Sequence, residues 1–64
     1  MNPREFKRFL LIARGSNSEL QTQLELSGLM GFADPQLLIT AREISHEIEK
    51  MLLALLGRLK NDSG

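Results

Sequence analysis

Residues 13–24 read ARGSNSELQTQL, and this stretch decides how the 64-residue chain folds. It places small and polar residues in the middle of what the flanking pattern predicts to be one long helix. An apolar stripe with helical spacing passes through it, made of Phe6, Phe9, Leu10, Ala13, Leu20 and Leu24. Ser16, Asn17 and Ser27 lie within that stripe and dilute it.

A second stripe occupies roughly the opposite side of the same segment. Its ends are leucines and its middle is small and polar, in the order Leu11, Gly15, Ser18, Thr22, Leu26 and Leu29. A helix that is apolar on two sides is usually contacted on two sides. We therefore expect a second chain to approach this stripe closely at its small residues.

The ends of this helix are marked by local signals. Asn2 can cap it, Pro3 suits its first position, and Glu5 can complete a capping box. Gly31 suits the left-handed residue that follows a helix. We predict a helix over about residues 3–30, followed by a turn over 31–34.

Gly15 leaves an alternative open. Ser16 and Glu19 also form a capping-box pattern, which would start a new helix there. A glycine within a helix costs only about 1 kcal/mol relative to alanine. Because both stripes keep their phase across Gly15, we expect the helix to continue through it.

A second helix is predicted over about residues 35–60, since Asp34 and Pro35 repeat the starting signal of Asn2 and Pro3. Its apolar positions form a heptad seam, namely Leu37, Ala41, Ile44, Ile48, Met51 and Leu55. Four leucines widen the seam, at positions 38, 52, 56 and 59. The other side is charged, with Arg42, Glu43, His46, Glu47, Glu49 and Lys50.

These elements predict a single all-α domain over residues 1–64, an antiparallel helical hairpin. Each helix would be roughly 40 Å long, and the single interface of a hairpin cannot cover both apolar arcs. A core this small rarely supplies more than about 3–5 kcal/mol without a staple or a partner chain, and the chain has no cysteine. We therefore expect obligate self-association into a four-helix bundle, through Leu11, Gly15, Ser18, Thr22, Leu26, Leu37, Ile44, Ile48, Met51 and Leu55.

The sequence offers no constellation for catalysis or metal binding. Glu43 and His46 have the Glu-x-x-His spacing of di-iron bundles, but we expect Ile44 and Ile48 to face inward, so that this pair points outward. Ser16 and Ser18 lack a histidine partner for nucleophilic chemistry. We expect no catalytic residue, no metal and no cofactor.

The distribution of charge is the one sequence feature that suggests a function, although acidic and basic residues cancel overall. An antiparallel hairpin would bring both basic ends together into a basic pole, made of Arg4, Lys7, Arg8, Arg14, Arg58 and Lys60. Arg58 and Lys60 favourably oppose the dipole of the second helix. Phosphate binding would explain Arg4, Lys7 and Arg8, and so would pairing with acidic residues of another subunit. No apolar run approaches the ~20 residues of a membrane span, so we expect a soluble, cytoplasmic protein.

The chain also resembles the C-terminal half of the four helix bundle protein family, also called 23S rRNA intervening-sequence proteins. The resemblance is carried by residues 12–16 (IARGS), 19–20 (EL) and 22–26 (TQLEL), and it resumes at 43–45 (EIS). Family members are single chains of four helices, so this chain would be either a short paralogue that dimerises or a fragment. The resemblance implies a non-enzymatic, self-assembling protein. The alternative function is that of an RNA- or DNA-binding accessory protein acting through the basic pole.

Overall fold

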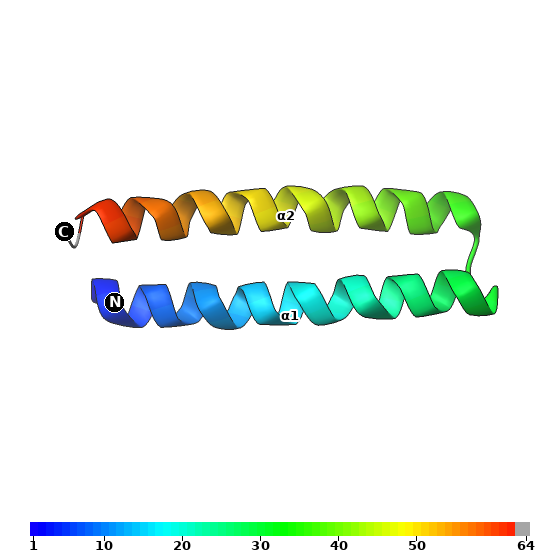
Figure 1. Ribbon diagram of the computed structural model, residues 1–64, viewed down its shortest axis with the longest axis horizontal. Helices are drawn as coiled ribbons and strands as arrows, with labels where there is room; N and C mark the ends of the chain where they lie inside the picture. Colours follow the sequence, from blue (N-terminus) through cyan, green and yellow to red (C-terminus); the bar gives the residue numbers. More distant parts are fainter. Residues whose placement is uncertain (63–64) are drawn as a thin grey trace.

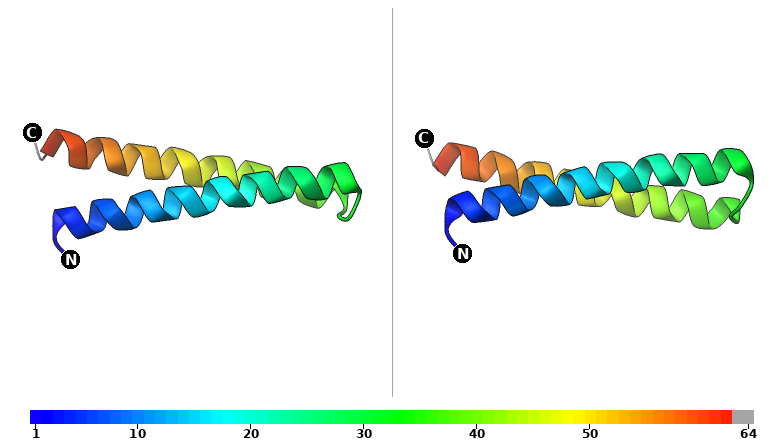
Figure 2. Two further views of the ribbon diagram at one scale, coloured as in Figure 1. Left: turned by 60° about the horizontal axis from the view of Figure 1, so that its bottom comes forward. Right: turned by 90° about the horizontal axis from the view of Figure 1, so that it is seen from below.

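The protein is an antiparallel hairpin of two long helices, α1 (Pro3–Met30) and α2 (Pro35–Asp62) (Figure 1). This computed structural model describes the backbone of residues 1–62 and the side chains of residues 1–59. No strand occurs within that part, so the expected all-α class and the packing of two helices against each other are confirmed. The helices lie side by side along their length and cross at a shallow angle (Figure 2).

Both helices begin at the capping residues that the sequence indicates. The Asn2 side chain accepts a hydrogen bond from the Glu5 backbone N–H, with Oδ1 and N 2.8 Å apart. The Asp34 carboxylate accepts one from the Gln36 N–H at 2.9 Å. These bonds satisfy backbone donors that have no partner within the helix.

Helix α1 runs through Gly15 without a break and ends at Gly31. Gly31 has φ 70° and ψ 25°, the left-handed conformation. Its N–H donates to the Gly28 carbonyl at 3.3 Å, and the Phe32 N–H donates to the Ser27 carbonyl at 3.1 Å. This pair of bonds is the Schellman motif, and it turns the chain into the short connection to α2.

We expect glycine-to-alanine substitutions at positions 15 and 31 to have opposite effects. Gly31→Ala should lower the free energy of unfolding by about 1–2 kcal/mol, because a Cβ strains the left-handed conformation. Gly15→Ala should raise it by about 0.5–1 kcal/mol, since no described atom outside the local helix backbone lies within 4 Å of where the new Cβ would stand. Urea unfolding of both variants at one protein concentration measures this. A destabilised Gly15→Ala variant would show that another chain packs closely there.

The interface between the helices differs from the predicted stripes. Side chains that are buried or half-buried on α1 are Phe6, Leu10, Ala13, Asn17, Gln21, Leu24 and Ser27. Those on α2 are Leu38, Ala41, Ser45, Ile48, Glu49, Leu52, Leu56 and Leu59. Within the first apolar stripe of α1, Phe9 and Leu20 stay outside this interface, because their side chains are 60% and 44% exposed.

The predicted seam of α2 faces α1 only in part. Ala41 and Ile48 are half-buried there, whereas the other four residues, Leu37, Ile44, Met51 and Leu55, are exposed. Ser45 faces α1, whereas its neighbour Ile44 is exposed. The leucines expected only to widen the seam, such as Leu38 and Leu52, fill the interface instead. The physical reason is the polar contact between Asn17 and Ser45, which fixes how α2 is rotated about its axis.

The hairpin is elongated and has little apolar core. The Cα atoms span 46 × 16 × 15 Å, with a radius of gyration of 14.6 Å, against roughly 11 Å for a compact chain of this length. Among the described apolar side chains only Leu10 and Leu52 are buried, at 4% and 8% exposed. Neither helix, over residues 1–62, has a stretch long and apolar enough to span a membrane.

Candidate functional site

A polar layer lies at the centre of the hairpin, where leucine pairs would be expected. The Asn17 Nδ2 donates to the Ser45 carbonyl oxygen at 3.0 Å. The Ser45 hydroxyl donates in return to the Asn17 Oδ1 at 2.9 Å. Both side chains are buried, and no buried side-chain nitrogen or oxygen in the described part lacks a partner. A fully satisfied buried polar pair of this kind can fix the register of two helices.

An ion pair extends this polar layer to the surface. The Arg14 Nε donates to the Glu49 Oε1 at 2.7 Å, and the Asn17 Nδ2 lies 3.4 Å from the Glu49 Oε2. The hydrogen bond from Arg14 is the main reason why the pKa of the Glu49 carboxyl is lowered. Partial desolvation raises this pKa, and the hydrogen bond from Asn17 lowers it further. The expectation that Glu49 lies on the solvated charged side was therefore wrong. We use the name polar layer for Arg14, Asn17, Ser45 and Glu49.

The lowered pKa of Glu49 predicts how stability changes with pH. A carboxyl whose pKa is lower in the folded state contributes stability above its unfolded pKa and loses it as pH falls through the folded pKa. We expect this contribution to fade as pH falls below about 4.3, the ordinary glutamate value. In Arg14→Gln, NMR titration of the Glu49 carboxyl carbon should give a midpoint nearer the ordinary value. An unchanged midpoint would contradict the ion pair.

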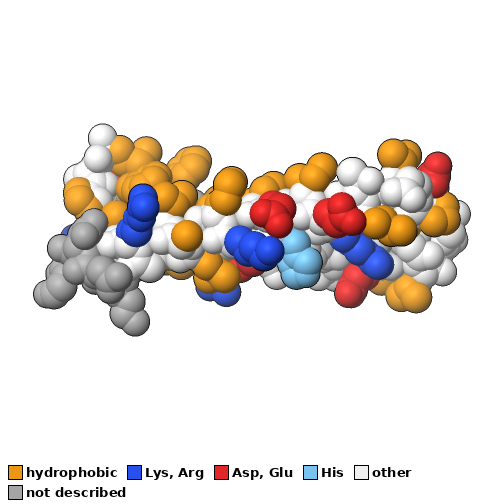
Figure 3. Space-filling view, turned by 90° about the horizontal axis from the view of Figure 1, so that it is seen from above, with side chains coloured by type: hydrophobic (Ala, Val, Ile, Leu, Met, Phe, Trp, Pro, Cys, Tyr) orange, Lys and Arg blue, Asp and Glu red, His pale blue; other side chains and the backbone are white. Residues whose placement is uncertain are grey.

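Four exposed apolar side chains of α2 lie on the side opposite to that ion pair, whereas Ile39 and Leu53 are exposed on the side of Glu49. Each residue turns a helix by about 100°, so Ile44 projects about 100° to one side of Ser45 and Glu49 about 40° to the other. Leu37, Met51 and Leu55 continue the line of Ile44 at intervals of seven and four. We name these four residues the apolar row. All are exposed, and Figure 3 shows apolar side chains along one edge of the hairpin.

Helix α1 adds to this apolar side. Arg14 and Glu49 meet on one side of the Asn17–Ser45 contact. Arg14 lies three residues before Asn17 and Leu20 three residues after it, so the two side chains project about 60° to opposite sides of Asn17. Leu20 thus lies on the side of Ile44. One long side of the hairpin therefore carries the apolar row and Leu20, and the other carries the ion pair.

The small-residue stripe of α1 lies elsewhere. Leu11, Gly15 and Ser18 line a shallow hollow together with Arg14 and Glu49. The exposed residues among those predicted for self-association therefore fall on two separate surfaces, while Ile48 is half-buried against α1. Thr22 and Leu26 continue the stripe of α1 away from the apolar row. Leu11, Thr22 and Leu26 are all exposed.

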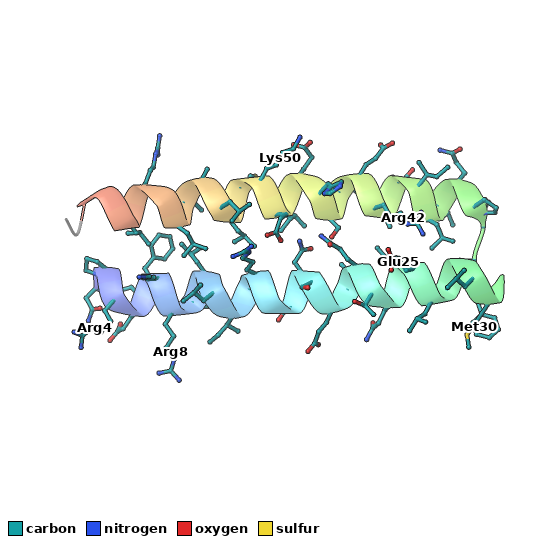
Figure 4. All side chains as sticks on the ribbon, in the orientation of Figure 1. Arg4, Arg8, Glu25, Met30, Arg42 and Lys50 are labelled. Carbon is teal, nitrogen blue, oxygen red and sulfur yellow. The ribbon has the colours of Figure 1, made fainter. Side chains whose placement is uncertain are left out.

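The residues of the predicted basic pole have different surroundings in the structure. The start of α1 and the end of α2, which carry the basic residues, lie at the same end of the hairpin (Figure 1). Arg4 and Lys7 line a hollow with Leu59 there. Figure 4 shows Arg4 and Arg8 pointing away from α2. Arg14 is held by Glu49 nearer the middle of the hairpin. Arg58 lies beside Leu55, and the Lys60 side chain lies outside the described part.

Glu43 and His46 are exposed on α2. His46 lines a hollow with Gln21, Glu25 and Arg42. Within the described residues, no three His, Cys, Asp or Glu side chains are grouped so that they could hold a metal ion.

Comparison of the chain with protein-family models, with curated proteins and with solved structures found no match. The site is therefore defined by its geometry alone: a hairpin with a satisfied polar layer inside and an apolar side that no part of the described chain covers.

Proposed function

We propose that the protein is a non-enzymatic assembly protein, whose hairpin joins a second copy to complete a four-helix bundle. The observation that supports this most strongly is the exposure of its large apolar side chains. The apolar row, Leu20 and Phe9 all lie in solvent when the hairpin stands alone. Burying such side chains is the main favourable term in folding and association.

The surface area gives this argument a magnitude. The accessible surface of the hairpin is 5290 Å², whereas a compact protein of this mass exposes roughly 4,100 Å². The excess is about 1,200 Å² per chain. Two copies that each cover this excess bury roughly 2,400 Å², which exceeds the 1,200–2,000 Å² typical of stable interfaces.

The resemblance to the four helix bundle protein family supports the same proposal. In that family one chain supplies four helices, and a pair of hairpins would supply the same number. The absence of a catalytic constellation among the described residues is compatible with a role in assembly. The proposed location of this protein is the cytoplasm.

Sedimentation equilibrium over about 1–100 μM protein tests the proposal. We expect a particle mass of at least twice the 7.2 kDa of the chain, with the helical circular-dichroism signal falling as the particle dissociates. A stably folded particle of 7.2 kDa at micromolar concentration would refute self-association.

Nucleic-acid binding is a second candidate function, supported by the cluster of Arg4, Lys7 and Arg8 at the open end of the hairpin. Basic side chains that neutralise phosphates give binding that weakens steeply with salt. We expect RNA or DNA to bind at low ionic strength, and an Arg4→Ala/Lys7→Ala/Arg8→Ala variant to lose that binding. No binding by the unaltered protein at low salt would eliminate this function.

A further inference from the structure

We propose that the second copy packs on the apolar row from Ile44 to Leu55, with α2 antiparallel to α2, about a two-fold axis that passes near Met51. This inference rests on the proposed self-association and adds its surface and its orientation. It is argued from the distribution of charge along α2.

Two shallow hollows follow each other along the exposed side of α2, and Met51 lines both of them. Glu43, Ile44, Glu47 and Ile48 line the first. Ala54, Leu55 and Arg58 line the second. The apolar row therefore has an acidic rim on one side of Met51 and a basic rim on the other.

A two-fold axis near Met51 brings unlike rims together. Arg58 lies seven residues after Met51, or about 10.5 Å along the axis, and Glu47 lies four residues before it, or about 6 Å. In the antiparallel pair, Arg58 of one copy is offset from Glu47 of the second by only about 4.5 Å, which an arginine side chain spans. Because the contact is isologous, it occurs twice in each dimer.

A parallel pair has the opposite consequence. It places Glu47 beside Glu47 and Arg58 beside Arg58, so that like charges meet at both ends of the apolar row. Complementary charges across an interface select the orientation of the partner. Packing through the small-residue stripe of α1 would instead leave Glu47 and Arg58 outside the interface.

Charge reversal tests the orientation by sedimentation equilibrium at low salt. We expect Glu47→Lys and Arg58→Glu each to raise the dissociation constant roughly tenfold, since each replaces two attractive pairs with repulsive ones. The combined Glu47→Lys/Arg58→Glu variant should return it to within about threefold of the original. Glu19→Lys, the same exchange at an exposed position of α1, is the matched control and should leave it unchanged.

The outcomes separate this inference from the function on which it rests. A monomeric unaltered protein refutes the proposed function. A dimeric unaltered protein whose dissociation constant none of the variants changes retains self-association and overturns the antiparallel pairing on the apolar row. Weakening by each single reversal without recovery in the combined variant also overturns it.

Discussion

Replacing Met51 with lysine is expected to raise the dissociation constant of the assembly by more than a hundredfold. Met51 lies near the proposed two-fold axis and is 60% exposed in the single hairpin. Each Met51 that is buried in the dimer contributes about 1.5–3 kcal/mol, and a two-fold dimer buries two of them. Lysine removes both contributions and adds the cost of desolvating a charge.

The matched control is Leu53→Lys. Leu53 is also on α2 and is 45% exposed, but it lies two residues away, on the side of Glu49. We expect this variant to change the dissociation constant by less than about threefold, because it lies outside the apolar row and isolated surface substitutions have small effects. Sedimentation equilibrium of both variants decides the matter. Equal effects of the two lysines would show that the apolar row has no special role.

A single hairpin should also be much less stable than the assembly. Among its described apolar side chains, two are buried, Leu10 and Leu52, and small cores supply only a few kcal/mol. We therefore expect the thermal midpoint of the unaltered protein to rise with protein concentration. The midpoint of Met51→Lys should be lower and nearly independent of concentration.

The course of the backbone could be predicted from the sequence because its signals are local. Asn2, Asp34 and Gly31 act on neighbouring backbone groups through bonds that span two to five residues. The continuity of α1 through Gly15 follows from the modest cost of glycine within a helix. None of these features depends on how α1 and α2 are rotated against each other.

The inner face of α2 could not be predicted, since that rotation depends on a contact across 28 residues of sequence. A seam with as many apolar residues, which includes Ile44 and Met51, competed with the one that holds Ser45. The signal that sequence reasoning missed is the pair of small polar residues, Asn17 and Ser45, each set within an apolar stripe. Each can satisfy the hydrogen bonds of the other only if both face inward, and an unpaired buried polar group would be costly.

The contact between Asn17 and Ser45 also explains why the apolar row stays exposed in the single hairpin. A helix with one broad apolar arc can present only its centre to a single neighbour. The polar layer draws Ser45 to that position and turns Ile44 and Met51 to the side. The contact that orders the hairpin therefore also determines which apolar side chains remain to be covered.

Replacing Asn17 with alanine is the second large expected effect. The substitution removes the acceptor of the Ser45 hydroxyl and a donor to the Ser45 carbonyl. Ser45 is 1% exposed, so water cannot readily replace these bonds. Leaving a buried polar group without its partner costs about 1–3 kcal/mol. We expect Asn17→Ala to lower the free energy of unfolding by about 2 kcal/mol, measured by urea titration at one protein concentration.

Two further variants separate the loss of the polar pair from the loss of any side chain. Gln23→Ala removes an exposed amide from α1 and should change stability by less than about 0.5 kcal/mol. Asn17→Leu/Ser45→Ala replaces both partners with apolar groups, which is often neutral or stabilising. Because it also deletes the polar contact that fixes the rotation of α2, its amide NMR spectrum should show more than one set of resonances. A single sharp set of resonances in that variant would show that apolar packing alone selects the inner face.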